Sequence, residues 1–179
     1  MNHELESELG FSRETIATCL EREGLLSVEL EFTKKCNLRC IYCYSAAGDG
    51  LEQELSLREI VSVIEQARDL GAKKIVLLGG GEPFLFPDIL EVVRHIHTLG
   101  LSQAVFTNGT LLTEELCRFL FAHRVQVAIK HNSMHPAVQD ALAGVAGAHR
   151  GIQRGLRLLM EAGYPGEGRP LCIQSVVCR

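Results

Sequence analysis

The sequence lacks three features that mark common classes of protein. No apolar run approaches the roughly 20 residues that a membrane-spanning helix needs. The net charge of -4 provides no basic excess to neutralise nucleic-acid phosphates. The first ten residues, MNHELESELG, are acidic and polar, unlike a secretory signal. These absences argue against a membrane protein, a general nucleic-acid binder and a secreted protein.

The seven cysteines fit a disulfide framework poorly, because their number is odd and no secretory signal precedes them. Thiols stay reduced in the cytoplasm, which is therefore the expected location. We expect the cysteines to be metal ligands or buried core residues. Cys19 and Cys117 lie in helical patterns typical of core thiols. Cys172 and Cys178 share one strand face, so an auxiliary cluster there is a further alternative.

The chain of 179 residues suits one domain with a sizeable core. Residues 1–24 show a partial helical periodicity, which Ser12 interrupts, and are predicted as an N-terminal helical segment. From residue 25 to residue 179, strands and helices alternate. The predicted strands are 25–33, 73–80, 102–108, 125–133 and 171–178, and the predicted helices are 56–71, 86–100, 113–124, 135–144 and 148–163.

This alternation predicts a parallel α/β sheet with right-handed crossovers. No glycine-rich phosphate fingerprint follows the first strand, which weakens a dinucleotide-binding interpretation. Strands covered by helices on both faces should be apolar on both, yet Glu29 and Glu31 share one face of the first strand, as Gln126 and Lys130 do in the fourth. The pattern favours an open barrel with a polar lumen over a flat sheet that is covered by helices on both faces.

Chemically active side chains cluster after four of the predicted strands. CNLRCIYCY (36–44) follows the first strand, GGGEP (79–83) the second, TNG (107–109) the third and KHNS (130–133) the fourth. The carboxyl ends of parallel strands meet at one edge, where α/β proteins place their functional groups. We therefore expect these segments to form one site.

Cys36, Cys40 and Cys43 lie on one short loop, so their thiolates can converge on one cluster. Three thiolates would leave one iron of a four-iron cluster open, as catalytic zinc sites keep an open position. A zinc site with a histidine as fourth ligand, or three unrelated loop cysteines, would give the same spacing. The spacing alone leaves these alternatives open.

The motif Cys36-x-x-x-Cys40-x-x-Cys43, with Tyr42 before its last cysteine, resembles the signature of radical S-adenosylmethionine (radical SAM) enzymes. GGGEP is similar to the glycine–glutamate motif after the second strand of that family, and the resemblance runs from about residue 28 to the end. It implies a partial (β/α)6 TIM-like barrel, a [4Fe–4S] cluster on the three cysteines and S-adenosylmethionine on the open iron. An electron, from a donor such as a flavodoxin or ferredoxin, would cleave the sulfonium to give a 5′-deoxyadenosyl radical that abstracts a substrate hydrogen.

The resemblance also implies a set of cofactor-binding residues. Tyr42 would lie near the adenine, and Glu82 would accept hydrogen bonds from the methionyl amino group. The alternatives for Lys130 are a cofactor carboxylate, a substrate anion or no ligand. The full set is Tyr42, Gly79, Gly80, Gly81, Glu82, Asn108, Lys130, Asn132 and Ser133.

The segment 133–165 is similar to family members of the SPASM type, which modify peptides or small metabolites. The family barrel usually has six strands, whereas five are predicted here. The resemblance therefore implies a partial barrel truncated after its fifth strand, which a C-terminal domain or a partner chain is expected to complete. Two alternatives to an enzyme remain: a non-catalytic iron–sulfur or zinc module, and a partner-dependent fragment of a larger enzyme.

Overall fold

A parallel five-stranded sheet forms the centre of the computed structural model, which describes residues 10–177. The strands lie in the order β1-β2-β3-β4-β5, so neighbours in the sequence are neighbours in the sheet. This order never reverses, as in a barrel and unlike a doubly wound sheet. The predicted partial barrel is thus confirmed. The strands are β1 (Ser27–Leu30), β2 (Lys74–Leu77), β3 (Ser102–Thr107), β4 (Val125–Lys130) and β5 (Leu171–Gln174).

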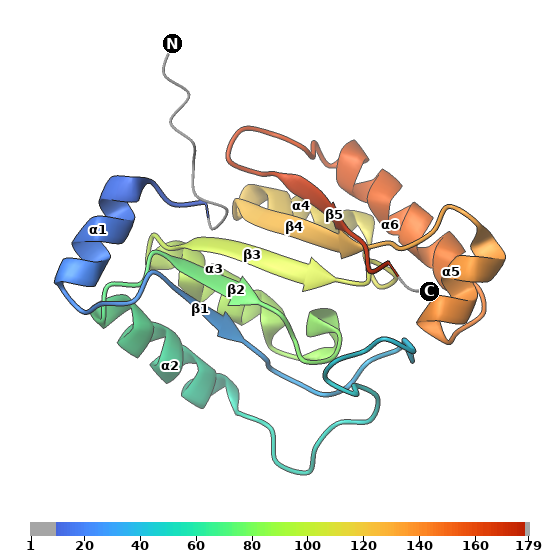
Figure 1. Ribbon diagram of the computed structural model, residues 1–179, viewed down its shortest axis with the longest axis horizontal. Coiled ribbons are helices and arrows are strands. Elements are labelled where there is room, and N and C mark those ends of the chain that lie inside the picture. The colour runs from blue at the N-terminus through green and yellow to red at the C-terminus, as the bar shows by residue number, and fades with distance from the viewer. Residues whose placement is uncertain (1–9, 178–179) are drawn as a thin grey trace.

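Helices α2, α3, α4 and α6 lie along one face of the sheet (Figure 1). Their starts follow from local capping: the Ser56 and Glu59 pair forms the predicted capping box of α2, and the Thr113 hydroxyl caps α4. No helix among residues 10–177 is long and apolar enough to cross a membrane. The helices are α1 (Arg13–Glu21), α2 (Leu57–Asp69), α3 (Ile89–Thr98), α4 (Glu114–Ala122), α5 (Pro136–Ala143) and α6 (Ala148–Glu161), with a 3-10 turn, η1, at Pro83–Leu85.

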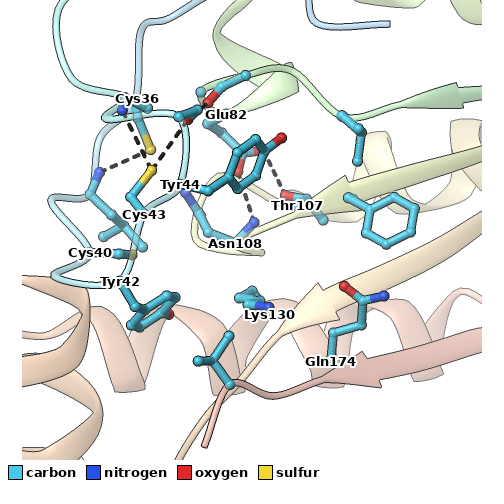
Figure 2. Close-up of a pocket in the computed structure, with 18 of the residues that line it drawn as sticks. Cys36, Cys40, Tyr42, Cys43, Tyr44, Glu82, Thr107, Asn108, Lys130 and Gln174 are labelled. Carbon is cyan, nitrogen blue, oxygen red and sulfur yellow. Dashed lines mark hydrogen bonds between the residues drawn. The ribbon is translucent and has the colours of Figure 1, made fainter. Parts of the chain in front are cut away.

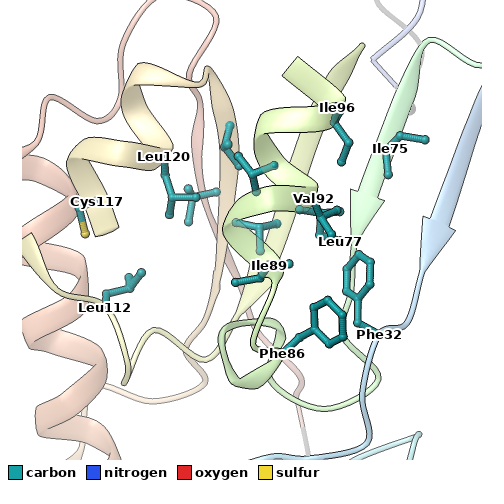
Figure 3. Packing of buried hydrophobic residues seen from close by; sticks show 14 of the residues in the cluster. Phe32, Ile75, Leu77, Phe86, Ile89, Val92, Ile96, Leu112, Cys117 and Leu120 are labelled. Atoms are coloured by element: carbon teal, nitrogen blue, oxygen red, sulfur yellow. The ribbon is translucent and has the colours of Figure 1, made fainter. Parts of the chain in front are cut away.

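The main core fills the space between the sheet and these helices (Figure 3). Ile75 and Leu77 of β2 are fully buried against α3, and the Phe32 and Phe86 rings stack with centroids 5.6 Å apart. Each such buried side chain contributes about 1.5–3 kcal/mol to folding.

The opposite face of the sheet carries the polar residues, as the alternation predicts. In β4, Val125, Val127 and Ile129 are buried in the core, whereas Gln126 and Lys130 lie on the other face and are partly exposed. This second face lies open to a cavity at the carboxyl ends of the strands.

Three boundaries of helices and strands differ between the prediction and the structure. Ser12 does not interrupt a helix but begins one, because its hydroxyl accepts the Thr15 N–H over 3.1 Å. Residues 1–9 of the predicted helical segment lie outside the described residues. The first strand ends at Leu30 rather than residue 33, because the chain turns there and pairs Thr33 with Gly80. The fifth strand ends at Gln174, and Cys178 lies outside the described residues.

Candidate cofactor site

A cavity of about 420 Å³ lies at the carboxyl ends of the strands, where the sequence places its motifs. This volume falls within the range of small-molecule pockets. Its lining combines the open face of the sheet with the loops after β1, β2 and β3 (Figure 2). The lining includes Glu29, Cys36, Leu38, Cys40, Tyr42, Cys43, Tyr44, Ser45, Gly80, Gly81, Glu82, Phe106, Thr107, Asn108, Lys130, Gln174 and Val176.

The three cysteines of the predicted motif all line this cavity as free, partly buried thiols. The Leu38 N–H donates to Cys36 Sγ, and the Ala47 N–H donates to Cys43 Sγ, each over 3.5 Å. Hydrogen bonds of this kind tune iron–sulfur clusters through their thiolate ligands. The loop is therefore folded so that backbone amides already face two of the three sulfurs.

The thiols differ in how readily they ionise without a metal. Burial raises the pKa of Cys36 and of Cys40. Burial also acts to raise the pKa of Cys43, but hydrogen bonds from the Ser45 hydroxyl and nearby backbone amides outweigh it and lower that pKa. Because thiolates are the metal-binding form, loading the site releases protons.

The donor set fits a cluster better than a single ion. Among residues 10–177, no three His, Cys, Asp or Glu side chains are placed to hold one metal ion. Zinc needs its ligands about 2.3 Å from one centre, whereas each thiolate of a four-iron cluster binds a different iron, so the sulfurs spread wider. The zinc alternative gains no support, and a cluster on three thiolates fits the residues present.

The GGGEP segment packs directly on the cysteine loop. The Gly81 N–H donates to the Thr33 carbonyl over 2.7 Å, and the Glu82 N–H donates to the Lys35 carbonyl over 2.9 Å. A Cβ on Gly81 would lie 2.0 Å from the Lys35 oxygen, so only glycine permits this approach. Gly80 and Gly81 line the cavity, while Gly79 does not.

Glu82 is the buried acid of the cavity, with 1% of its surface exposed. It accepts hydrogen bonds from the Thr107 hydroxyl over 2.6 Å and from the Asn108 N–H over 2.8 Å. Burial raises the pKa of its carboxyl to about 7, although these hydrogen bonds act to lower it. A carboxylate offers about four acceptor sites, so Glu82 retains capacity for a ligand.

Asn108 is held in a ring of hydrogen bonds that the sequence does not reveal. Its Nδ2 donates to Asn37 Oδ1 over 2.9 Å, Asn37 Nδ2 donates to Thr110 Oγ1 over 2.7 Å, and Thr110 Oγ1 donates to Asn108 Oδ1 over 2.6 Å. The ring joins the residue after Cys36 to the end of β3. Asn37 is thus a missed site residue, whose sequence signal is its position inside the cysteine motif.

Lys130 reaches the cavity from the open face of β4, as its strand parity predicts. It is the only cationic side chain among the described lining residues, and none of residues 10–177 forms an ion pair or a hydrogen bond with its ammonium. Gln174, its register partner on β5, also lines the cavity and was missed from sequence. Cys172 is exposed outside the cavity lining, and Cys117 is buried in the core as expected.

Asn132 and Ser133 lie beside the cavity rather than in its lining. The Asn132 side chain donates to the Tyr42 hydroxyl and accepts the Val176 N–H over 2.7 Å. The backbone amides of both residues donate to Gln139 Oε1, over 2.8 and 3.1 Å. The geometry gives both residues a bracing role between the cysteine loop and the ends of β4 and β5, and direct cofactor contacts remain predictions.

The family model described as the radical SAM superfamily matches residues 30–177. The chain belongs to the radical SAM superfamily. Enzymes of this superfamily use a [4Fe–4S] cluster and S-adenosylmethionine, which are therefore the cofactors of this core. Cys36, Cys40, Cys43 and Glu82 line one cavity, and their roles as cluster and cofactor ligands stay predictions.

Curated relatives share the superfamily but differ in their reactions. The chain is 34% identical over 137 residues to the AdoMet-dependent heme synthase of Methanosarcina barkeri, covering 75% of this chain and 39% of that protein. It is 40% identical over 94 residues to a probable GTP 3',8-cyclase of Methanothermobacter marburgensis, covering 52% and 30%. The matched part of the chain therefore spans only 39% and 30% of the length of these two relatives.

Solved structures agree on the fold. Streptococcus suis SuiB bound to precursor peptide SuiA superimposes with a TM-score of 0.72 at 18% identity, over 93% of this chain and 37% of that one. The structure of anSMEcpe with bound AdoMet gives a TM-score of 0.69 at 18% identity, over 86% and 45%. At this identity the match supports the radical SAM barrel fold alone.

Proposed function

We propose that this chain is the core of an enzyme that cleaves S-adenosylmethionine reductively and abstracts a hydrogen atom from its substrate. The observation that carries the proposal is the set of three free thiols on one rim of a cavity, next to a buried carboxylate. When bound, the cluster and S-adenosylmethionine supply the electron transfer and radical chemistry.

In this proposal Cys36, Cys40 and Cys43 hold the cluster, and Glu82 binds the methionyl amino group. The Thr107 and Asn108 hydrogen bonds fix the Glu82 carboxylate, so a cationic ammonium meets a preoriented acceptor. The ammonium would also lower the pKa of Glu82 from about 7, so binding and ionisation of this acid are coupled.

Tyr42 and Lys130 occupy the side of the cavity farther from Glu82 (Figure 2). We assign Tyr42 to the adenine, because it lines the cavity between Cys40 and Cys43. We assign Lys130 to a carboxylate, because it is a partly buried ammonium without a protein counter-ion among the described residues. The glycines, Asn108, Asn132 and Ser133 complete the proposed cofactor set.

The substrate is proposed to be a peptide or a small metabolite. The names of relatives support this breadth, since one is a PqqA peptide cyclase and another a heme synthase, and SuiB was solved with a precursor peptide. The electron donor is proposed to be a flavodoxin or ferredoxin. A further domain or a partner chain would cover the open edge of β5.

Anaerobic reconstitution with iron and sulfide tests this function. After reduction with S-adenosylmethionine present, the wild-type chain is expected to form 5′-deoxyadenosine, and Cys36→Ala, Cys40→Ala and Cys43→Ala are expected to form none. Cys19→Ala is the matched control, because this thiol donates to the Gly24 carbonyl far from the cavity. Product formation that survives loss of any motif cysteine would refute the ligand assignment.

A further inference from the structure

The loop that carries the cysteines docks on the carboxyl end of α5. The Arg39 N–H donates to the Ala143 carbonyl over 2.9 Å, and the Ile41 N–H donates to the Leu142 carbonyl over 3.1 Å. The last four carbonyls of a helix have no partner within the helix. Two of these carbonyls in α5 are therefore satisfied by amides that lie between Cys36 and Cys43.

Apolar packing strengthens the same contact. Leu38, with 4% of its surface exposed, packs with Ala143 and Ala148 in a small cluster separate from the main core, and Cys36 and Cys40 lie against this cluster. The small cluster therefore depends on the α5–α6 turn for its apolar partners. The turn itself is braced, because the Asp140 carboxylate accepts the Gly147 and His149 amides over 2.6 and 2.7 Å.

Gly144 is the point of closest approach between the turn and the loop. It adopts φ +68°, and a Cβ there would lie 2.2 Å from the Arg39 carbonyl oxygen. The position of a Cβ is fixed by the backbone that carries it, and the Arg39 oxygen is itself a backbone atom, so the overlap can be relieved only if the loop or the end of α5 moves. A side chain at this position would press on the peptide that precedes Cys40.

We propose that the carboxyl end of α5, with Gly144 as its positioning residue, sets the conformation in which the cysteine loop holds its cluster. This inference rests on the proposed cluster-binding function and extends it to a helix that supplies no ligand. Loss of the contact frees the middle of the loop while its ends remain attached through Asn37 and the Gly80–Gly81 segment. The cluster should then bind more weakly and be released faster.

Gly147 provides a matched control for Gly144. It lies in the same turn with a similar φ of +83°. A Cβ added to Gly147 would lie 3.6 Å from its nearest neighbour, which is the end of the Arg150 side chain. Gly144→Ala and Gly147→Ala both place an alanine in the left-handed region of backbone conformation. The two variants therefore have a similar conformational cost. Only Gly144→Ala pushes on the cysteine loop.

Two measurements test the proposal. In metal-free protein, amide hydrogen exchange at residues 39 and 41 should be about tenfold faster in Gly144→Ala than in wild type. In reconstituted protein, iron loss to a chelator should accelerate by a similar factor. Gly147→Ala should match wild type in both, and equal behaviour of the two alanine variants would overturn the proposal.

A second variant, Leu38→Ala, tests the same proposal if Gly144→Ala does not fold. Leu38→Ala removes the apolar contact from the loop side and leaves the main core unchanged, so circular dichroism should stay native. Faster exchange at residues 39 and 41 with faster iron loss would support the proposal, and wild-type values would overturn it. The exchange measurement needs no cofactor, so it stays informative even if wild type binds no cluster and the proposed function fails.

Discussion

Thr107 donates its hydroxyl hydrogen to Glu82 Oε1 over 2.6 Å, which joins the carboxyl ends of β3 and β2 beneath the cysteine loop. Glu82 in turn donates its backbone N–H to Lys35, the residue before Cys36. One buried acid therefore connects two strand ends and the loop that is proposed to hold the cluster. We therefore expect changes at Glu82 to affect both the stability of the fold and the proposed cofactor binding.

Glu82→Gln should change the pH dependence of stability in metal-free protein. The folded pKa of about 7 lies above the usual 4.5, so the stability that this group contributes is fully present below pH 4.5 and is lost as pH rises through 7. The expected loss is about 3 kcal/mol in the free energy of unfolding. Urea unfolding at pH 5 and pH 8 should show a smaller drop for Glu82→Gln than for wild type, and parallel drops would contradict the burial argument.

Gly81→Ala should abolish cluster binding and lower the melting temperature markedly, because its Cβ would overlap the Lys35 carbonyl at 2.0 Å. Gly100→Ala is the control: it has φ +70° with nothing within 4 Å of an added Cβ, so it should cost only about 1 kcal/mol. Thermal unfolding and iron content after reconstitution measure both effects. An iron content equal to that of the control would show that the loop does not need this close approach.

Asn37→Ala should destabilise the protein by about 1–3 kcal/mol, because it breaks the ring with Asn108 and Thr110 and leaves part-buried polar atoms unpaired. For a chain of this size each kcal/mol lowers the melting temperature by about 2–4 °C. Gln53→Ala, at an exposed position, should leave the melting temperature unchanged. Equal melting temperatures of the two variants would show that the hydrogen-bonded ring contributes nothing to stability.

Lys130→Met should weaken S-adenosylmethionine binding by about tenfold or more if its ammonium binds the cofactor carboxylate, without loss of iron. Lys74→Met is the control, because this lysine lies on the same face of the sheet but is bound to Gln126 at the other end. Equilibrium binding to the reconstituted protein separates the alternatives. Unchanged cofactor affinity with weaker substrate binding would assign Lys130 to the substrate, and no change in either would remove it from the site.

Sequence reasoning succeeded where local patterns decide the structure. The alternation in 125–130 placed Lys130 on the open face, the Ser56–Glu59 spacing gave the start of α2, and the four strand ends met at one rim. These features depend on strand and helix periodicity or on neighbouring residues, which a single sequence displays.

Prediction from the sequence failed for contacts that join segments distant in the chain. Asn37 and Asn108 are 71 residues apart, and the Gly144 approach to Arg39 depends on where α5 ends in space. Neither contact leaves a periodic signal, because each arises only after the sheet has assembled. The hydrogen bonds of the Asn132 side chain to the Tyr42 hydroxyl and the Val176 N–H belong to the same class, because they join the end of β4 to segments 90 and 44 residues away.

Three cysteines are proposed to hold a four-iron cluster whose open iron receives S-adenosylmethionine. Electron paramagnetic resonance of the reduced, reconstituted chain, with and without S-adenosylmethionine, tests this arrangement. Wild-type protein should give a [4Fe–4S] signal that shifts on addition of S-adenosylmethionine, and Cys40→Ala should give no such signal. A wild-type signal that S-adenosylmethionine leaves unchanged, at saturating concentration, would contradict it.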